Sequence, residues 1–172
     1  MPTVCIDGFN LALPKGSGIA TYGRNLLSNL NAIGMETQVL YGPLANISKQ
    51  PILNEVALTD AYTPDGNRVQ QMVESATARF GRTARAVPMT DNIIWPARGG
   101  GRPVAAACWS APRLFHTANR AFRSHRTFTP VNFAGHPEVA HPDVAHWTTV
   151  LPVHARGMAN VYTIHDMIPL RL

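Results

Sequence analysis

Two groups of side chains, near opposite ends of the chain, have the types and spacing needed for chemistry. His165 and Asp166 directly follow residues 160–164, an apolar run that predicts a buried strand. A histidine at a strand end can donate or accept a hydrogen bond and titrates near neutral pH, and the adjacent carboxylate can orient it or bind a hydroxyl. Ligands of open α/β sheets bind beyond the C-terminal ends of strands. We therefore expect this pair either to contact a substrate or to form its hydrogen bonds with backbone groups.

The second group is the loop of Lys15, Gly16, Ser17 and Gly18, which precedes a predicted helix. Its two glycines let a ligand approach the backbone closely, and the free amides, the helix dipole and the lysine all favour an anion. The loop matches neither the P-loop pattern nor the three-glycine dinucleotide fingerprint. It predicts either a phosphate-binding loop or an ordinary turn.

A βαβ unit would bring the two groups together. Residues 3–7 and 37–41 are apolar runs of strand length, and between them an apolar repeat with helical spacing comprises Ile19, Tyr22, Leu26, Leu30 and Ile33. Strand, helix and strand in close succession predict parallel strands. In one parallel sheet, residues 15–18 and 165–166 would lie at the same edge.

The middle of the chain predicts two helices. One is expected to begin near residues 63–65 and to end at Gly81, with an apolar stripe of Val69, Met72, Val73, Ala76 and Phe80. After a Gly- and Pro-rich loop at 91–103, another is expected from Val104, interrupted near Pro112. Its second part is amphipathic, with Phe115, Ala118 and Phe122 opposite Arg113, His116, Arg120 and Arg123. Such a helix can lie on an anionic membrane or pack its aromatic side chains on the sheet.

Three histidines follow at intervals of five residues, at His136, His141 and His146. This spacing alternates faces on a strand and separates residues by about 140° on a helix, so the imidazoles do not converge and no metal site is expected. Residues 143–146 predict a short strand with Trp147 and Thr148 emerging at its end. Residues 152–157 predict a loop before the last strand.

The composition is that of one globular domain. The chain has 172 residues, 45% of them hydrophobic, with no apolar run long enough to span a membrane and no signal-peptide pattern. Cys5 and Cys108 are too few for a disulfide framework and are expected to be buried thiols in a reducing compartment. Ten of the fifteen Lys and Arg residues lie in the segment 68–126, which suits phosphate, anionic lipid or nucleic acid.

Three segments together resemble family 4 glycosyltransferases. Residues 6–27, which include the run Lys-Gly-Ser-Gly-Ile-Ala-Thr-Tyr, are similar to that family's Asp…Gly-Ile-Gly-x-Tyr-x-x-x-Leu opening. Residues 160–170 resemble its Val-x-Thr-Ile-His-Asp-Leu-x-Pro strand, and residues 143–147 resemble the strand that precedes it. Ala20 replaces the family's usual second glycine, and residues 43–140 show no resemblance.

The resemblance implies half of a GT-B fold, an α/β domain with a Rossmann-like parallel sheet flanked by helices. Residues 1–172 would form the N-terminal, acceptor-side domain of a retaining glycosyltransferase, without the C-terminal domain that holds most of the nucleotide-sugar, so the isolated chain is expected to be inactive. The resemblance implies that Lys15, Gly16, Ser17 and Gly18 approach the donor diphosphate, that His165 touches the transferred sugar, and that Asp166 supports its loop. Trp147 and Thr148 are the expected acceptor contacts.

The expected partners are a nucleotide-sugar donor and a glycan or lipid-linked acceptor, without a cofactor or a metal. The expected location is the cytoplasm or the inner face of a membrane with anionic lipid. Two alternatives remain open. One is a non-catalytic sugar- or phosphate-binding α/β domain, and the other is a nucleic-acid-binding module built on residues 68–126, although no recognised RNA-binding core is present and nucleic acid is not the expected partner.

Overall fold

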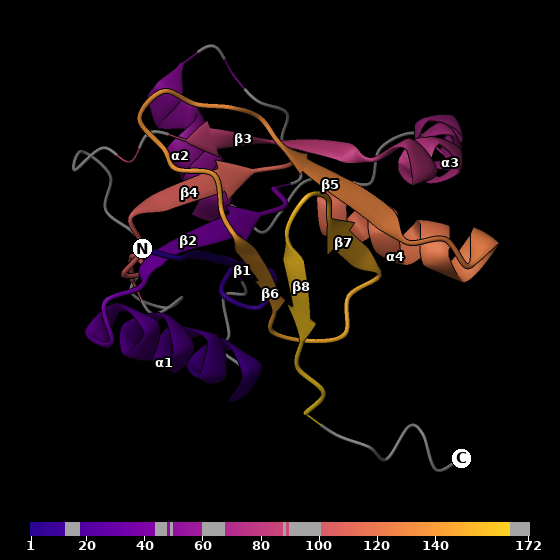
Figure 1. Ribbon diagram of the computed structural model, residues 1–172. Coiled ribbons are helices and arrows are strands. Elements are labelled where there is room, and N and C mark those ends of the chain that lie inside the picture. Colours follow the sequence, from indigo (N-terminus) through magenta and orange to yellow (C-terminus); the bar gives the residue numbers. More distant parts are fainter. Residues whose placement is uncertain are drawn as a thin grey trace.

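The computed structural model describes residues 1–12, 18–43, 48, 50–59, 68–87, 89 and 101–165. These residues form an α/β fold in which an eight-stranded sheet is flanked by helices (Figure 1). The strands are β1 (Thr3–Asp7), β2 (Glu36–Tyr41), β3 (Arg82–Val87), β4 (Ala107–Ser110), β5 (Thr129–Phe133), β6 (Val144–Trp147), β7 (Val153–Ala155) and β8 (Ala159–Tyr162). The helices are α1 (Gly18–Ala32), α2 (Pro51–Thr59), α3 (Arg68–Thr77) and α4 (Leu114–His125), with a short 3-10 helix, η1 (Ala78–Phe80).

The sheet is mixed rather than parallel throughout. Its strand order is β7-β5-β3-β4-β2-β1-β6-β8. One group of neighbouring strands runs parallel and consists of β4, β2, β1, β6 and β8. A second parallel group consists of β7, β5 and β3. The two groups meet at the antiparallel pair β3–β4. The predicted βαβ unit is confirmed, because β1 and β2 pair in parallel on either side of α1 in the chain. The expectation of an all-parallel sheet is wrong at β3–β4.

The strands at the two ends of this order, β7 and β8, contact each other. Tyr162 Oη donates a hydrogen bond to the carbonyl of Val153 at 2.6 Å. The side-chain amide of Asn160 exchanges two hydrogen bonds with the backbone of Ala155, at 2.7 and 2.8 Å. The sheet therefore curls back on itself, and β7 and β8 lie side by side (Figure 1).

Each face of the sheet carries its own core. Because side chains alternate along a strand, Val4 and Ile6 of β1 face the core that α1 and α2 cover, whereas Cys5 between them faces the core that α4 covers. The second core contains the two fully buried indoles, Trp109 and Trp147. A strand buried on both faces reads as a continuous apolar run, which is why β1 was predictable.

Several elements differ from the sequence-based expectation. The Ala-rich segment after Val104 was expected to be helical, but it forms β4, and α4 begins only at Leu114. Residues 152–157 were expected to be a loop, but they contain β7. The last strand is not buried: β8 ends at Tyr162 and forms an edge of the sheet, with Val161 44% exposed. Residues 63–67 and 91–100 lie outside the described residues.

Helix α3 has the expected helical repeat but turns the opposite face to the protein. Its predicted apolar stripe is exposed, whereas the polar residues Gln71 and Ser75 are buried. On the buried side, Arg113 Nε lies 2.9 Å from Glu74 Oε2, and this ion pair joins α3 to the start of α4. Among the described helices, none has both the length and the apolar character needed to cross a bilayer.

Candidate functional site

One edge of the sheet gathers the C-terminal ends of three neighbouring parallel strands, β1, β6 and β8. Asp7 ends β1, Thr148 follows β6, and Thr163 and His165 follow β8. Helix α1 begins beside this edge, because the ring of Tyr22 meets the ring of His165 edge to face with centroids 5.0 Å apart. Tyr22, one turn into α1, and His165 therefore lie at the same edge, while most of the residues predicted to meet there, 15–17 and 166, lie outside the described residues.

Asp7 is a buried carboxylate that joins the ends of β1 and β6. Its Oδ2 accepts a hydrogen bond from the backbone N–H of Thr148, and its Oδ1 accepts one from the backbone N–H of Phe9 at 3.2 Å. Burial raises the pKa of the Asp7 carboxyl above its ordinary value, and the hydrogen bonds from Thr148 and Phe9 lower it in part. With 1% of its surface exposed, Asp7 positions the backbone rather than a ligand.

His165 is exposed but has a fixed orientation. Its Nε2 lies 2.6 Å from the carbonyl oxygen of Thr148. A carbonyl can only accept a hydrogen bond, so Nε2 carries the proton, and Nδ1 of the neutral ring is then left as an acceptor. This hydrogen bond and the Tyr22 ring fix the imidazole at the sheet edge. Its Nδ1 can then accept a hydrogen bond from a hydroxyl group of a ligand.

A second polar cluster lies directly beside His165. Thr163 Oγ1 is 2.8 Å from His146 Nε2 and 3.1 Å from Tyr22 Oη, and Tyr22 Oη is 3.4 Å from the same imidazole nitrogen. Burial lowers the pKa of His146, so its neutral form is favoured at neutral pH. The cluster connects three parts of the chain, namely β6, α1 and the segment that follows β8. It therefore fixes this last segment, which also carries His165.

The structure places the other predicted site residues in different surroundings. Trp147 and Thr148 are each 1% exposed. Strand alternation turns the Trp147 indole into the core, where Nε1 donates to Asn160 Oδ1 at 2.9 Å, so this side chain has no open face for an acceptor. Gly18 is exposed at the start of α1. Lys15, Gly16, Ser17 and Asp166 lie outside the described residues.

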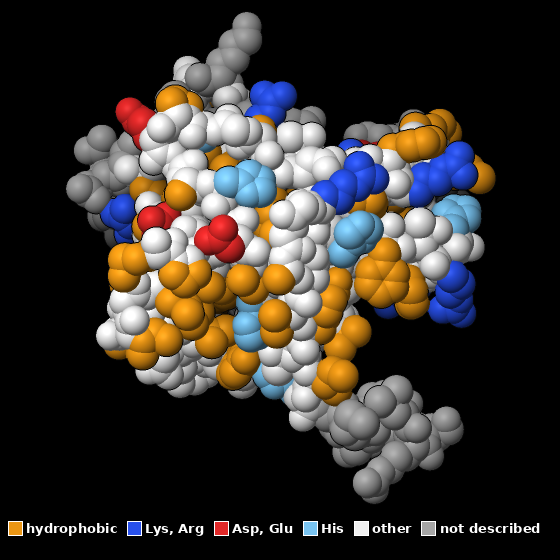
Figure 2. Space-filling view, in the orientation of Figure 1, with side chains coloured by type: hydrophobic (Ala, Val, Ile, Leu, Met, Phe, Trp, Pro, Cys, Tyr) orange, Lys and Arg blue, Asp and Glu red, His pale blue; other side chains and the backbone are white. Residues whose placement is uncertain are grey.

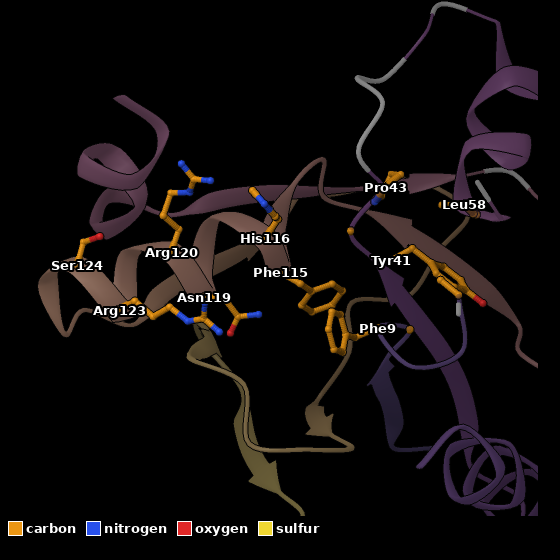
Figure 3. A pocket seen from close by; sticks show the side chains of 13 residues that line it. Phe9, Tyr41, Pro43, Leu58, Phe115, His116, Asn119, Arg120, Arg123 and Ser124 are labelled. Carbon is orange, nitrogen blue, oxygen red and sulfur yellow. The ribbon is translucent and has the colours of Figure 1, made fainter. Parts of the chain in front are cut away.

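A pocket of about 540 Å³ opens beyond the C-terminal ends of β1 and β2. Phe9 and Phe115 meet edge to face between its walls, with ring centroids 5.4 Å apart (Figure 3). One wall is the face of α4 that carries His116, Asn119, Arg120 and Arg123, and the other contains Tyr41, Pro43 and Leu58. Since Phe9 follows Asp7 by two residues, the pocket and the His165 cluster share the end of β1.

Two glycines allow the aromatic rings of this pocket to lie against the backbone. A Cβ atom at Gly8 would lie 2.6 Å from ring carbons of Tyr41, and one at Gly42 would lie 2.7 Å from a ring carbon of Phe115. Both distances are shorter than a carbon–carbon contact permits. The rings of Tyr41 and Phe115 can thus lie this close to the ends of β1 and β2 only because both positions are glycine.

Metal and thiol chemistry receive no support from the described residues. Within them, no group of three or more His, Cys, Asp or Glu side chains could hold a metal ion. Cys5 and Cys108 are buried free thiols, as predicted, and burial raises the pKa of Cys108 to about 12 and that of Cys5 well above its usual range. Neither thiol is therefore available as a thiolate nucleophile.

Sequence reasoning missed four polar members of the edge, namely Asp7, Tyr22, His146 and Thr163. The signal for Asp7 was present, because it ends an apolar run in the same way that His165 does. No protein-family model, curated protein or solved structure matches the chain.

Proposed function

We propose that the chain is the acceptor-side half of a retaining glycosyltransferase. It would act on a nucleotide-sugar donor and transfer the sugar to a glycan or lipid-linked acceptor in the cytoplasm. The observation that carries the proposal is the contact between Tyr22, near the start of α1, and His165, after β8. Each of these residues belongs to one of the two end segments whose sequences resemble family 4 glycosyltransferases, and Tyr22 and His165 are 143 positions apart in the chain.

In this proposal the edge of β1, β6 and β8 is one side of a donor cleft. Gly18, the first residue of α1, would face the donor diphosphate, which the positive end of the helix dipole favours. Gly18 suits this role, since no heavy atom lies within 4 Å of the position of an added Cβ. The same end of the helix dipole would stabilise the negative charge that develops on the leaving diphosphate.

His165 would contact the transferred sugar. Its Nε2–H is engaged by the carbonyl of Thr148, so Nδ1 is the nitrogen that accepts a hydrogen bond from a sugar hydroxyl. Thr148 is itself held by Asp7, which makes Asp7 a positioning residue for His165. The second half of the proposed GT-B fold would supply the remaining donor contacts, so binding by this chain alone is expected to be weak.

Binding of a nucleoside diphosphate sugar to the 172-residue chain tests the proposal. NMR titration is expected to shift the backbone amides of Gly18 and Tyr22 and the imidazole of His165 in one saturable transition. Gly18→Val and His165→Ala should each weaken that binding at least about tenfold, since each removes or blocks one hydrogen-bonded contact to a charged or polar ligand. Shifts confined to other parts of the chain, or an affinity equal to that of the wild type in both variants, would refute the proposal.

A transfer assay with a donor-binding half present tests the catalytic part. His165→Ala should lower kcat/KM by about 100-fold or more while the thermal unfolding midpoint stays unchanged. Near-normal turnover would remove His165 from the reaction. Donor binding without any transfer would instead favour a non-catalytic nucleotide-sugar-binding domain.

A further inference from the structure

The basic face of α4 is a wall of a pocket rather than a free surface. The sequence pattern placed His116, Arg120 and Arg123 on one helix face, and their spacing of three and four residues keeps them together. In the structure all three line the 540 Å³ pocket, together with Asn119 (Figure 3). Figure 2 shows basic side chains gathered over α3 and α4.

The two arginines of this wall have no carboxylate partner among the residues that the structure describes. Within the described part of the chain, neither Arg120 nor Arg123 forms an ion pair, whereas Arg113 at the start of the same helix is paired with Glu74. A guanidinium group presents a planar fork of donors that matches the oxygens of a phosphate. Two such groups beside an imidazole and a carboxamide suit a dianion.

The opposite wall and the floor are apolar. Phe9, Tyr41 and Phe115 contribute aromatic rings, and Pro43 and Leu58 close the wall. Phe9 and Phe115 meet edge to face, and Phe9 is half-buried whereas Phe115 is buried (Figure 3). Ligand pockets of about 300–1,000 Å³ with mostly apolar walls and a few charged groups are typical sites for small molecules.

We propose that this pocket binds a small molecule in which a phosphate monoester is attached to a ring. The phosphate would lie against Arg120, Arg123 and His116, and the ring would lie against Phe9 and Phe115. This site goes beyond the proposed transferase function, because none of its contacts involves His165 or the start of α1. It also assigns the basic face of α4 to a small ligand instead of a membrane.

Phenyl phosphate is a suitable probe because it contains both halves of the proposed ligand. Isothermal titration of the 172-residue chain should give saturable binding with a Kd of about 1 mM or tighter. Inorganic phosphate and phenol each have one half and should bind at least about tenfold more weakly. Equal affinity for phenyl phosphate and either of these probes, or no saturable binding of phenyl phosphate, would overturn the proposal.

Charge-matched variants assign the binding to the pocket. Arg120→Gln and Arg123→Gln should each weaken phenyl phosphate binding about tenfold, through the loss of a charged hydrogen bond. Arg156→Gln makes the same charge change at an exposed residue that does not line the pocket and should leave the affinity within about twofold. Equal loss in all three variants would indicate nonspecific charge attraction and contradict a built site.

Two further measurements separate this proposal from other occupants. His165→Ala should leave phenyl phosphate binding unchanged, so that a failure of the transferase proposal and a failure of this one are told apart. A mixed-sequence oligonucleotide should not displace phenyl phosphate at moderate salt. The outcome that would overturn the pocket proposal has two parts: the oligonucleotide displaces phenyl phosphate from the wild type, and Arg120→Gln and Arg156→Gln weaken this displacement equally. That outcome would assign the basic surface to nucleic acid.

Discussion

Thr163 links the segment that carries His165 to both β6 and α1. Its Oγ1 contacts His146 Nε2 at 2.8 Å and Tyr22 Oη at 3.1 Å, while its backbone N–H donates to the carbonyl of Trp147 at 3.0 Å. Thr163→Val removes the two hydroxyl contacts and keeps the backbone bond and a similar side-chain shape. At about 1 kcal/mol for each partly buried hydrogen bond, the free energy of unfolding should fall by about 1–2 kcal/mol. The Tm of a chain of this length should fall by about 3–6 °C.

The same change should alter the titration of His146. Burial lowers the pKa of His146 in the folded chain, whereas the imidazole titrates near pH 6.5 in the unfolded chain. Between these two pKa values the unfolded chain binds more protons, so the stability from this group is present above about pH 6.5 and is lost as pH falls toward the folded pKa. Thr163→Val replaces the hydroxyl beside the imidazole by an apolar methyl group, which stabilises the charged ring less, so the folded pKa should fall further below its ordinary value and this loss should become larger.

Urea unfolding at several pH values and an NMR titration of the His146 ring measure both effects. Thr83→Val is a matched control, because Thr83 is exposed on β3 and its replacement should change stability by no more than about 0.5 kcal/mol. The reasoning fails if Thr163→Val matches Thr83→Val in stability and leaves the His146 titration unchanged.

Three further changes have expected outcomes. Burial raises the pKa of Asp7 in the folded chain, so the contribution of this carboxyl to stability is present below about pH 3.9 and is lost as pH rises through the folded pKa. Urea unfolding should therefore show that the stability of the wild type relative to Asp7→Asn falls over that pH range. Gly42→Ala places a Cβ 2.7 Å from Phe115 and should destabilise the fold by about 1–3 kcal/mol in thermal unfolding. Glu74→Gln leaves the largely buried Arg113 guanidinium without its carboxylate, and urea unfolding should show a loss of about 2–3 kcal/mol.

Exposed positions provide the controls for two of these changes. Gly18→Ala adds a Cβ that meets no heavy atom within 4 Å, and Glu138→Gln neutralises an exposed carboxylate. Each should change stability by no more than about 0.5 kcal/mol. If a control matched its test variant, the close approach at Gly42 or the ion pair at Glu74 would have no energetic role. A relative stability of Asp7→Asn that did not vary with pH would contradict the shifted pKa.

The elements around the site could be predicted because their sequence signals are local. β1 and β2 are buried on both faces and appear as continuous apolar runs, and the helical repeat between them has the correct period. β4 was missed because the Ala-rich segment 104–108 has high intrinsic helix propensity, and only pairing with β2 and β3 makes it a strand. β7 has only three residues, too few for any periodicity.

The direction in which side chains point could not be predicted, because it depends on what packs against each element. The apolar stripe of α3 had the right spacing, yet the polar side of the helix faces the protein, where Glu74 pairs with Arg113. Trp147 was expected to follow the strand, but it is the last residue of β6, and its place in the strand turns the indole into the core. The pocket likewise forms only when α4 lies against the ends of β1 and β2.

The account depends most on the start of α1 and the segment after β8 meeting at one sheet edge. NMR of the chain in solution tests this directly through nuclear Overhauser effects between the ring protons of Tyr22 and His165, whose centroids lie 5.0 Å apart. We expect clear cross-peaks and a ring-current shift of His165 that disappears in Tyr22→Leu. Absent cross-peaks, together with a His165 shift that Tyr22→Leu does not change, would contradict the shared edge.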